Sequence, residues 1–528
     1  MLFNSYEFLF LFLPVTWVGF FWFARRGHEP AIAWLVLASL FFYGWWQPIY
    51  LLLLLVSLLA NFGLGSLLGQ AHRQGRQRAG KIWLIAGVLF NLALLGYFKY
   101  ANFTVDSINI VAGTHFHLET IILPLAISFF TFQQIAYLTD AYQGDAREYR
   151  FAHYALFVTF FPQLIAGPIV HHRDMLPQFM RPGALTPRAA NMAVGLGIFA
   201  LGLFKKTVLA DGIAQYATPV FNAAASGESL TFFEAWGGAL AYTLQLYFDF
   251  SGYSDMAVGS ARMFGILLPV NFHSPYKATN IIEFWRRWHM TLSSFLRDYL
   301  YIALGGNRAG QLMRYRNLML TMLLGGVWHG AGWTFVAWGA LHGMYLCINH
   351  VWRHASTRLF PARNTSAPLA KALSWLLTFL AVVIGWVFFR AGSFDAAIAL
   401  LQGMAGINGI ALPNAIAARL DKVWPVLADV GVGTYLGGGS QFIFTWLWVI
   451  ALMSVALIMP NTQEIMRVTA PGLHLHTGRG ADAIQPVARL TQTLAWEATA
   501  AWAVGIGVIA AIAVLAMTRI SEFLYFQF

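Results

Sequence analysis

Apolar runs recur along the whole chain, and this pattern most limits the folds open to it. Of the 528 residues, 58% are hydrophobic and only 10% are charged, whereas about a quarter of the residues in soluble domains are charged. Many runs approach the roughly 20 residues with which an α-helix crosses a bilayer, and we count roughly 11 to 13 membrane-embedded segments, not all of them full spans. The sequence therefore predicts an all-α fold that forms a single polytopic membrane domain over residues 1–528.

The charged residues between the runs predict how the chain is threaded through the membrane. Arg25 and Arg26 follow the first run, at about 8–23, and a basic loop covers 72–81, whereas the turn at 47–48 carries no charge. Because basic loops stay in the cytoplasm, we expect the N-terminus on the outer, periplasmic side. Two more basic stretches fit the cytoplasmic face, and two hydrophilic gaps are expected to be large loops: 173–188 and 353–371, and 409–439 and 460–490.

The same composition argues against several classes of function. The net charge of +11 lies in short loops rather than on a soluble domain, so we discard nucleic acid as a partner. Cys347 is the only cysteine, which excludes an internal disulfide and any cysteine-based metal cage. The histidines are scattered without HExxH spacing, and there is no Gly-x-Ser-x-Gly elbow, so neither a zinc site nor a serine triad is expected.

One histidine lies where an ionisable side chain is costly. His329 is in the middle of the apolar run 318–338, with two glycines within four residues on each side. An ionisable group at membrane depth normally marks a pathway or a reaction site. The glycines should break the helix, and irregular backbone is tolerated at that depth only inside protein or along a cavity. We therefore expect His329 to face a cavity inside the membrane.

A polar stretch at 280–300 is the second unusual region. It contains no Gly or Pro and is predicted to be one helix, on which His289 shares a face with Trp285 and Ser293. Such a helix could lie at the membrane interface with its charges in water. It could instead line a polar cavity with His289 pointing inward, although a hydrogen-bonded core histidine would have the same pattern.

Two other segments depart from plain apolar spans. Asp249, Tyr253 and Asp255 make the stretch 245–256 too polar for a lipid-facing surface. These side chains could orient a histidine through hydrogen bonds, but a helix-terminal network without chemistry is equally consistent. Farther upstream, 161–168 has two prolines and a glycine in an apolar run, which predicts a broken or re-entrant segment.

Several of these motifs together resemble the membrane-bound O-acyltransferase superfamily. The resemblance rests on Trp328-His329-Gly330, on 285–289 and on 297–299. Four further segments are similar to the membrane subunits of bacterial alginate O-acetyltransferases: 8–14, 96–103, 249–256 and 304–308. The family core is expected over about 119–395, with C-terminal helices and loops over about 396–528.

The resemblance implies a bundle of helices, some broken or re-entrant, around a central funnel or tunnel in a bacterial inner membrane. It implies that His329 is the catalytic histidine and that His289 is the second histidine of the site. The implied donor is acetyl-CoA from the cytoplasm, with no bound cofactor and no metal. The acetyl group would pass to periplasmic or membrane-anchored partner proteins, which would O-acetylate an exopolysaccharide such as alginate. Ten more residues are candidates to line the donor site or the tunnel: Trp328, Trp285, Ser293, Arg297, Asp298, Asp249, Asp255, Tyr253, Asn307 and Arg308.

The residue types suit that chemistry. A neutral imidazole is the natural general base for a hydroxyl that attacks a thioester, and such a base contributes about 10²–10⁴-fold. An acyl-histidine intermediate is also chemically possible. His289 could hydrogen-bond the donor carbonyl or the acceptor, with Ser293 placed to orient it. Three basic residues could meet the phosphates of coenzyme A, although residues that only set topology would look the same: Lys277, Arg308 and Arg316.

One nearby histidine is left out of the predicted site. His342 follows His329 by 342 − 329 = 13 residues, which is about 220° round a continuous helix. The two rings are therefore expected to point apart, unless the glycines between them bend the chain.

Two other classes of function stay open beside the acyltransferase. A transporter or polysaccharide-export channel would share the many spans, the broken helices and the buried polar groups, but it would not cleave acetyl-CoA. A scaffold that only assembles an envelope complex would not need His329. Within the acyltransferase class, the polymer could also be cellulose or peptidoglycan.

Overall fold

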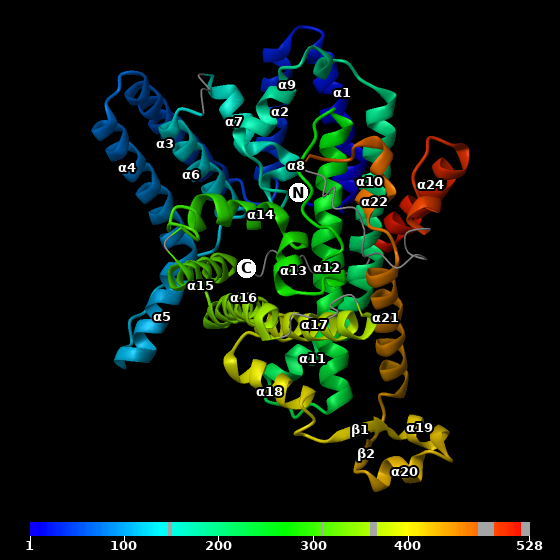
Figure 1. The fold of residues 1–528 in the computed structure, drawn as a ribbon. Helices are drawn as coiled ribbons and strands as arrows, with labels where there is room; N and C mark the ends of the chain where they lie inside the picture. Colours follow the sequence, from blue (N-terminus) through cyan, green and yellow to red (C-terminus); the bar gives the residue numbers. More distant parts are fainter. Residues whose placement is uncertain (146–149, 309, 360–366, 474–489, 519–528) are drawn as a thin grey trace.

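The structure, a computed structural model, is built almost entirely from helices (Figure 1). It describes residues 1–145, 150–308, 310–359, 367–473 and 490–518, apart from the side chain of Pro182. Within these residues the only strands are β1 (Ile410–Pro413) and β2 (Val432–Tyr435), which pair in parallel. The predicted all-α class is confirmed.

The N-terminal part is a series of apolar helices that ends in α5. The first predicted run is confirmed: a π-helical turn leads into α1, whose first turn holds a proline that has no N–H to satisfy there. A second π-helical turn joins α4 to α5 without a break. The elements are η1 (Phe8–Phe12), α1 (Leu13–Ala24), α2 (His28–Gly44), α3 (Ile49–Arg73), α4 (Gln77–Leu95), η2 (Gly96–Tyr100) and α5 (Ala101–Ala112).

The central part surrounds α12 (Phe232–Met263), a helix of 32 residues that is buried along most of its length. Thr231 and Glu234 close its first turn with a capping box, which satisfies N–H groups that have no partner within the helix. The predicted break in 161–168 begins at Phe160, whose ψ of 111° separates α7 from the single turn α8. The elements before α12 are α6 (Ile127–Gln143), α7 (Phe151–Thr159), α8 (Phe161–Leu164), α9 (His172–Phe179), η3 (Pro182–Leu185), α10 (Ala189–Phe204), η4 (Lys205–Ala210) and α11 (Asp211–Ala225).

The next elements carry the histidines, and here one prediction is wrong. The stretch 280–300 is not one helix, because α13 ends at Arg287 and α14 begins at Met290. Between them His289 is left-handed, with φ 42° and ψ 53°, a strained conformation that persists only where surrounding contacts hold it. In Figure 1, α16 and α17 run across α12. The elements are η5 (Pro275–Lys277), α13 (Ile281–Arg287), α14 (Met290–Phe295), η6 (Leu296–Tyr301), α15 (Gln311–His329), α16 (Trp333–Leu359), α17 (Pro368–Arg390) and α18 (Phe394–Met404).

The C-terminal part begins with a small folded module where we expected a loop. Over 409–439 the chain forms β1, short helices and β2, which together project from one end of the molecule (Figure 1). The second expected loop, 460–490, contains α22 and η8 in its described part, and 474–489 lies outside the described residues. The elements are α19 (Asn414–Ala417), η7 (Ala418–Leu420), α20 (Trp424–Asp429), α21 (Gly439–Ile458), α22 (Thr462–Ile465), η8 (Arg467–Thr469) and α24 (Ala500–Ala516).

Length and apolarity together identify only some of the helices as membrane spans. Among the described residues, five helical stretches are long and apolar enough to cross a membrane: 49–73, 77–112, 189–225, 368–390 and 439–458. Three shorter helices are also apolar: 8–24, 394–404 and 500–516. Helices such as α12 carry charged groups and are buried inside the protein, so the criterion of length and apolarity leaves them out. The count of roughly 11 to 13 embedded segments therefore stays a prediction.

Candidate active site

His329 is the last residue of α15, and the predicted break follows it directly. Gly330 is extended, with φ −157° and ψ 149°, and α16 begins at Trp333. The helix α16 folds back along α15 because Gly326 and Gly339 let the two backbones touch. A Cβ atom on either glycine would overlap a carbonyl oxygen of the other helix. This hairpin fixes the position of the His329 backbone.

Aromatic side chains enclose the His329 ring. The residue is 7% exposed, and the centroid of its ring lies 4.9 Å from that of Trp328, 5.1 Å from Trp338 and 5.2 Å from Phe389. These partners come from α15, α16 and α17. These rings shield the imidazole on three sides, so electrostatic interactions there are stronger than in solution.

His289 is fully buried, and its ring is oriented by a residue that we did not predict. The Nδ1 atom of His289 lies 3.1 Å from Oδ1 of Asn271. The same oxygen accepts from the backbone N–H of Thr291 at 3.2 Å and from its hydroxyl at 2.9 Å. An oxygen bound by these two donors is an acceptor, so Nδ1 of His289 carries the hydrogen. The Nε2 atom therefore has a free lone pair, and no described residue bonds to it.

The two histidines lie close enough to act on one group. Their ring centroids are 6.3 Å apart. A ring nitrogen lies about 1.2 Å from its centroid and a hydrogen bond adds about 2.8 Å, so a direct nitrogen-to-nitrogen bond would need centroids within roughly 5.2 Å. At 6.3 Å the rings are too far apart for a direct bond, but they can share one oxygen atom between them.

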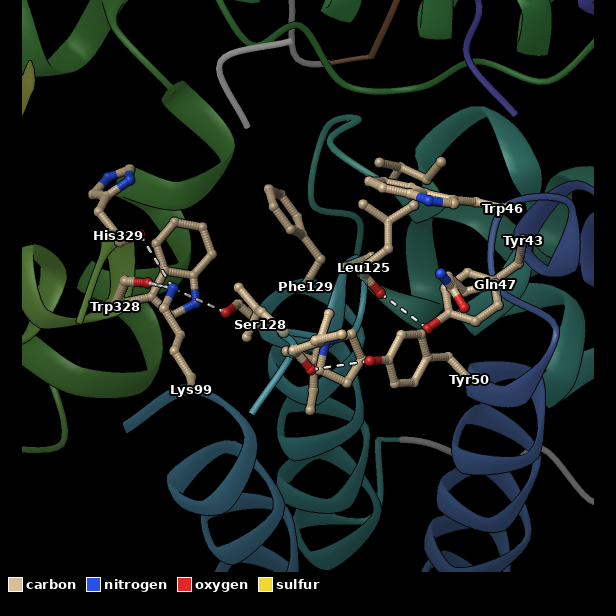
Figure 2. A pocket seen from close by; sticks show the side chains of 16 residues that line it. Tyr43, Trp46, Gln47, Tyr50, Lys99, Leu125, Ser128, Phe129, Trp328 and His329 are labelled. Atoms are coloured by element: carbon tan, nitrogen blue, oxygen red, sulfur yellow. Dashed lines mark hydrogen bonds between the residues drawn. The ribbon is translucent and has the colours of Figure 1, made fainter. Parts of the chain in front are cut away.

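A cavity of about 240 Å³ lies beside His329 (Figure 2). Lys99 is at the same end as His329, and the opposite end is formed where α2 meets α3. The hydroxyl groups of Tyr43 and Tyr50 donate to backbone carbonyls of the wall segment 122–129, at 3.0 and 3.1 Å. The other lining residues outside that segment are Trp46, Gln47, Ile165 and Trp328.

His329 also lines a second cavity, of only about 10 Å³. Such a volume has room for about one water-sized group. Among the described residues, His329 is the only one that lines both cavities, so its ring is at their junction. The rest of the small cavity is buried and apolar: Leu246, Phe250, Trp288, Trp338, Trp386 and Phe389.

Three of the predicted residues lie near the histidines, but not all in the expected role. Trp328 lines the large cavity beside His329, as its motif suggested. Trp285 is one layer farther away, 5.8 Å from Trp338 between ring centroids. The hydroxyl of Ser293 bonds to the backbone carbonyl of residue 288 at 3.4 Å. Ser293 therefore does not orient the His289 ring, and Asn271 does so instead.

The polar groups of α12 lie away from both histidines. Asp249 pairs with Lys206 at 2.6 Å, and Asp255 pairs with Lys205 at 2.6 Å. Both lysines belong to η4, so these charges compensate each other inside the bundle. The ring of Tyr253 stacks on that of Phe3, with 4.7 Å between the ring centroids. The suggestion that this group orients a histidine is wrong, and the ion pairs occupy the interior of α12 rather than its end.

The remaining charged and polar candidates lie outside the two cavities. Arg297 and Asp298 pair with each other at 2.7 Å, and the Arg297 side chain is 61% exposed. The Lys277 ammonium donates to a backbone carbonyl of residue 459 at 2.8 Å. Three others are exposed: Asn307, Arg308 and Arg316. A role for any of them in meeting coenzyme A stays a prediction.

His342 is closer to the site than a continuous helix would place it. Because the glycines do bend the chain, the fully buried ring of His342 lies 4.9 Å from Trp338, the same side chain that contacts His329 at 5.1 Å. No described residue bonds to either ring nitrogen of His342. His329 and His342 therefore flank Trp338. The spacing of 13 residues alone did not predict this arrangement.

Comparisons with known proteins identify relatives of this chain. A family model described as MBOAT, membrane-bound O-acyltransferase family, matches residues 141–388, which include both site histidines. A peptidoglycan O-acetyltransferase from Helicobacter pylori is 47% identical over 439 residues, which cover 78% of this chain and 81% of the relative. A probable alginate O-acetylase from Pseudomonas aeruginosa is 44% identical over 409 residues, or 76% and 75% of the two chains. A teichoic acid D-alanyltransferase from Streptococcus thermophilus is 28% identical over 283 residues, or 50% and 68%.

Proposed function

Because the chain belongs to the membrane-bound O-acyltransferase family, we propose that it is an O-acetyltransferase of the bacterial inner membrane. In the proposed reaction, the acetyl group of cytoplasmic acetyl-CoA moves to a hydroxyl group presented from the outer side of the membrane. Periplasmic or membrane-anchored partner proteins then carry it to an exopolysaccharide such as alginate, the polymer in the name of the Pseudomonas aeruginosa relative.

The observation that best supports this proposal is the position of His329 between two different cavities. The large cavity reaches the uncharged turn between α2 and α3, which the charge pattern assigns to the outer side. An acceptor hydroxyl would enter there. The small aromatic cavity of about 10 Å³ has room for a group of roughly methyl size, which suits an acetyl group better than a longer acyl chain.

His329 is the general base in the mechanism that we derive from this geometry. One ring nitrogen accepts the proton of the acceptor hydroxyl while the hydroxyl oxygen attacks the carbonyl carbon of the thioester. The tetrahedral intermediate then collapses, the carbon–sulfur bond breaks, and the imidazolium returns the proton to the coenzyme A thiolate. The Nε2 lone pair of His289 accepts from the other His329 nitrogen through one bridging oxygen, a path that suits the 6.3 Å between the rings.

Peptidoglycan is a second candidate acceptor. The Helicobacter pylori relative named for that polymer is 47% identical to this chain, whereas the Pseudomonas aeruginosa relative named for alginate is 44% identical. The two values are too close to choose the polymer. A comparison of alginate and peptidoglycan fragments as acceptors, each with its matching periplasmic partner, would distinguish them.

The test is transfer of radiolabelled acetyl from acetyl-CoA by the purified full-length protein, with a periplasmic partner and either polymer. We expect His329→Ala to lower the rate about 10²–10⁴-fold, because the general base is lost. His289→Ala should lower it by about 10²-fold, because the His329 ring loses its support. His354→Ala changes an exposed histidine at the far end of α16 and should leave the rate unchanged.

Two results would overturn the proposal. One is a wild-type protein that moves no label from acetyl-CoA under any of these conditions. The other is a folded His329→Ala variant, with a thermal midpoint like that of His354→Ala, that transfers acetyl as fast as wild type. Transport of unmodified polymer across vesicles by the same protein would then favour the transporter.

A further inference from the structure

A lysine is buried within a membrane span next to the candidate site. Lys99 lies in η2, inside the apolar stretch 77–112, and is only 9% exposed. A charged side chain at that depth is costly and normally functional. Among the described residues no carboxylate forms an ion pair with it, in contrast to Lys205 and Lys206, which pair with aspartates of the bundle. Charge compensation therefore does not explain why Lys99 is there.

The Lys99 ammonium binds the end of the helix that carries His329. Its Nζ atom donates to the backbone carbonyl of Trp328 at 2.5 Å and to that of His329 at 3.1 Å (Figure 2). A third hydrogen bond, at 3.3 Å, goes to the hydroxyl of Ser128 on the cavity wall. The last carbonyls of an α-helix have no partner within the helix, and a cation is favoured at this negative end of the helix dipole.

The next residue along the chain bonds to the same helix end. The hydroxyl of Tyr100 donates to the backbone carbonyl of Val327 at 2.7 Å. Lys99 and Tyr100 thus bind three consecutive carbonyls, those of residues 327, 328 and 329. Lys99 and Tyr100 are the last two residues of the π-helical turn η2.

We propose that Lys99 and Tyr100 are positioning residues for His329. They hold the end of α15 in place at the point where the break after His329 leaves the backbone without a continuing helix. Their effect on catalysis is through His329 and not through contact with the acetyl donor. The inference rests on the proposed acetyl transfer, but its second measurement below does not depend on any activity.

The kinetic test uses Lys99→Met, which keeps the length of the side chain but loses the charge and the donors. We expect kcat for acetyl transfer to fall about 10–100-fold, because a small misplacement of a catalytic group is that costly, with KM for acetyl-CoA within about 2-fold of wild type. Lys99→Arg restores a cation with donors and should recover part of kcat. Tyr100→Phe removes one hydrogen bond and should lower kcat about 3–10-fold.

Two controls separate positioning from general stability. Thr207→Val removes a buried hydroxyl that donates across helices to the carbonyl of Ala513 at 2.9 Å. Thr207 lines neither cavity, so the change should leave kcat unchanged. On the His329→Ala background, Lys99→Met should slow the residual reaction less than about 2-fold, because residues that act through one another are not additive. An equal loss on both backgrounds, or a loss of the same size in Thr207→Val, overturns the inference.

Amide hydrogen exchange provides the measurement that needs no activity. In Lys99→Met and Tyr100→Phe, exchange should become at least about 10-fold faster over residues 326–332 and stay unchanged over α12, whereas Thr207→Val should leave 326–332 protected. Unchanged protection of 326–332 in both variants overturns the inference even if kcat falls. Wild-type protein that transfers no acetyl would defeat the proposed function, while the exchange result would still decide the role of Lys99.

Discussion

At the scale of single residues, the candidate site depends on which nitrogen of His289 carries a hydrogen. The amide oxygen of Asn271 accepts from Nδ1, so the lone pair on Nε2 is directed elsewhere. Because Thr291 also donates twice to that oxygen, the amide cannot easily turn round. A buried ring that is fixed in one tautomer can accept a proton or a hydrogen bond without first reorganising.

This arrangement predicts that Asn271 matters for rate rather than for binding. Asn271→Leu should lower kcat for acetyl transfer about 10–100-fold with little change in KM for acetyl-CoA, because the His289 ring becomes free to change tautomer and to rotate. Thr291→Val keeps the His289 bond and should cost less. The measurement is steady-state kinetics on wild type, Asn271→Leu and Thr291→Val. A Thr291→Val variant slower than Asn271→Leu would contradict the role of Asn271 in fixing the His289 ring.

The sequence was informative about residues that are unusual for their surroundings. His329 was singled out because an ionisable residue in an apolar run needs an explanation. His289 was singled out through the family resemblance, and the structure places its ring 6.3 Å from that of His329. Asn271 could not be predicted, since it is 18 residues from His289 and belongs to no pattern. Asp249 and Asp255 were misleading. They are as unusual for their surroundings as the histidines, but their partners are lysines that only the packing of η4 brings near.

At the scale of elements, the hairpin of α15 and α16 determines where His329 lies. The glycines on both sides of His329 predicted a break, and the structure has it at Gly330, whereas Gly325 and Gly326 stay within α15. The break at His289 was not predictable, because no glycine or proline marks it. Contacts with Asn271 and Phe250 hold His289 in its left-handed conformation, so tertiary structure overrode the helical preference of the local sequence.

The close approach of the two helices predicts a large effect of a single methyl group. Gly326→Ala should destabilise the protein by about 1–3 kcal/mol, because the new Cβ atom would overlap a carbonyl of α16. Activity should fall with it, since His329 is three residues away. Gly63→Ala is the matched control: that glycine, in α3, has no atom near its Cβ position, so the change should be neutral or stabilising by up to about 1 kcal/mol. Thermal unfolding in detergent measures both.

At the scale of the whole molecule, the topology can be tested with the single native cysteine removed. In a Cys347→Ser background, Leu436→Cys places a thiol beside the β1–β2 module, at a residue that is 91% exposed. Gln74→Cys places one in the basic loop between α3 and α4, at the opposite end of the molecule (Figure 1). A membrane-impermeant maleimide should label Leu436→Cys in intact cells and Gln74→Cys only after the inner membrane is opened. The reverse pattern would invert the assigned orientation.

The all-α membrane class was the easiest part to anticipate, because hydrophobic length depends on the bilayer and not on packing. The orientation inferred from loop charge stays a prediction. The folded module over 410–435 was not anticipated, since a short parallel strand pair leaves little periodicity in a polar segment. The cavities could not be predicted from the sequence either. Their walls combine residues from α2, the segment after α5, and α15, which are far apart in the chain.

The large cavity is lined by two different kinds of structure. At one end lies His329, held between packed helices, whereas residues 122–126 of the wall form no helix and accept hydrogen bonds from Tyr43 and Tyr50. Insertions, deletions and substitutions in such a non-helical segment disturb the surrounding helices little. We therefore expect acceptors of different shape to be accommodated by changes in this segment, with the position of His329 unchanged.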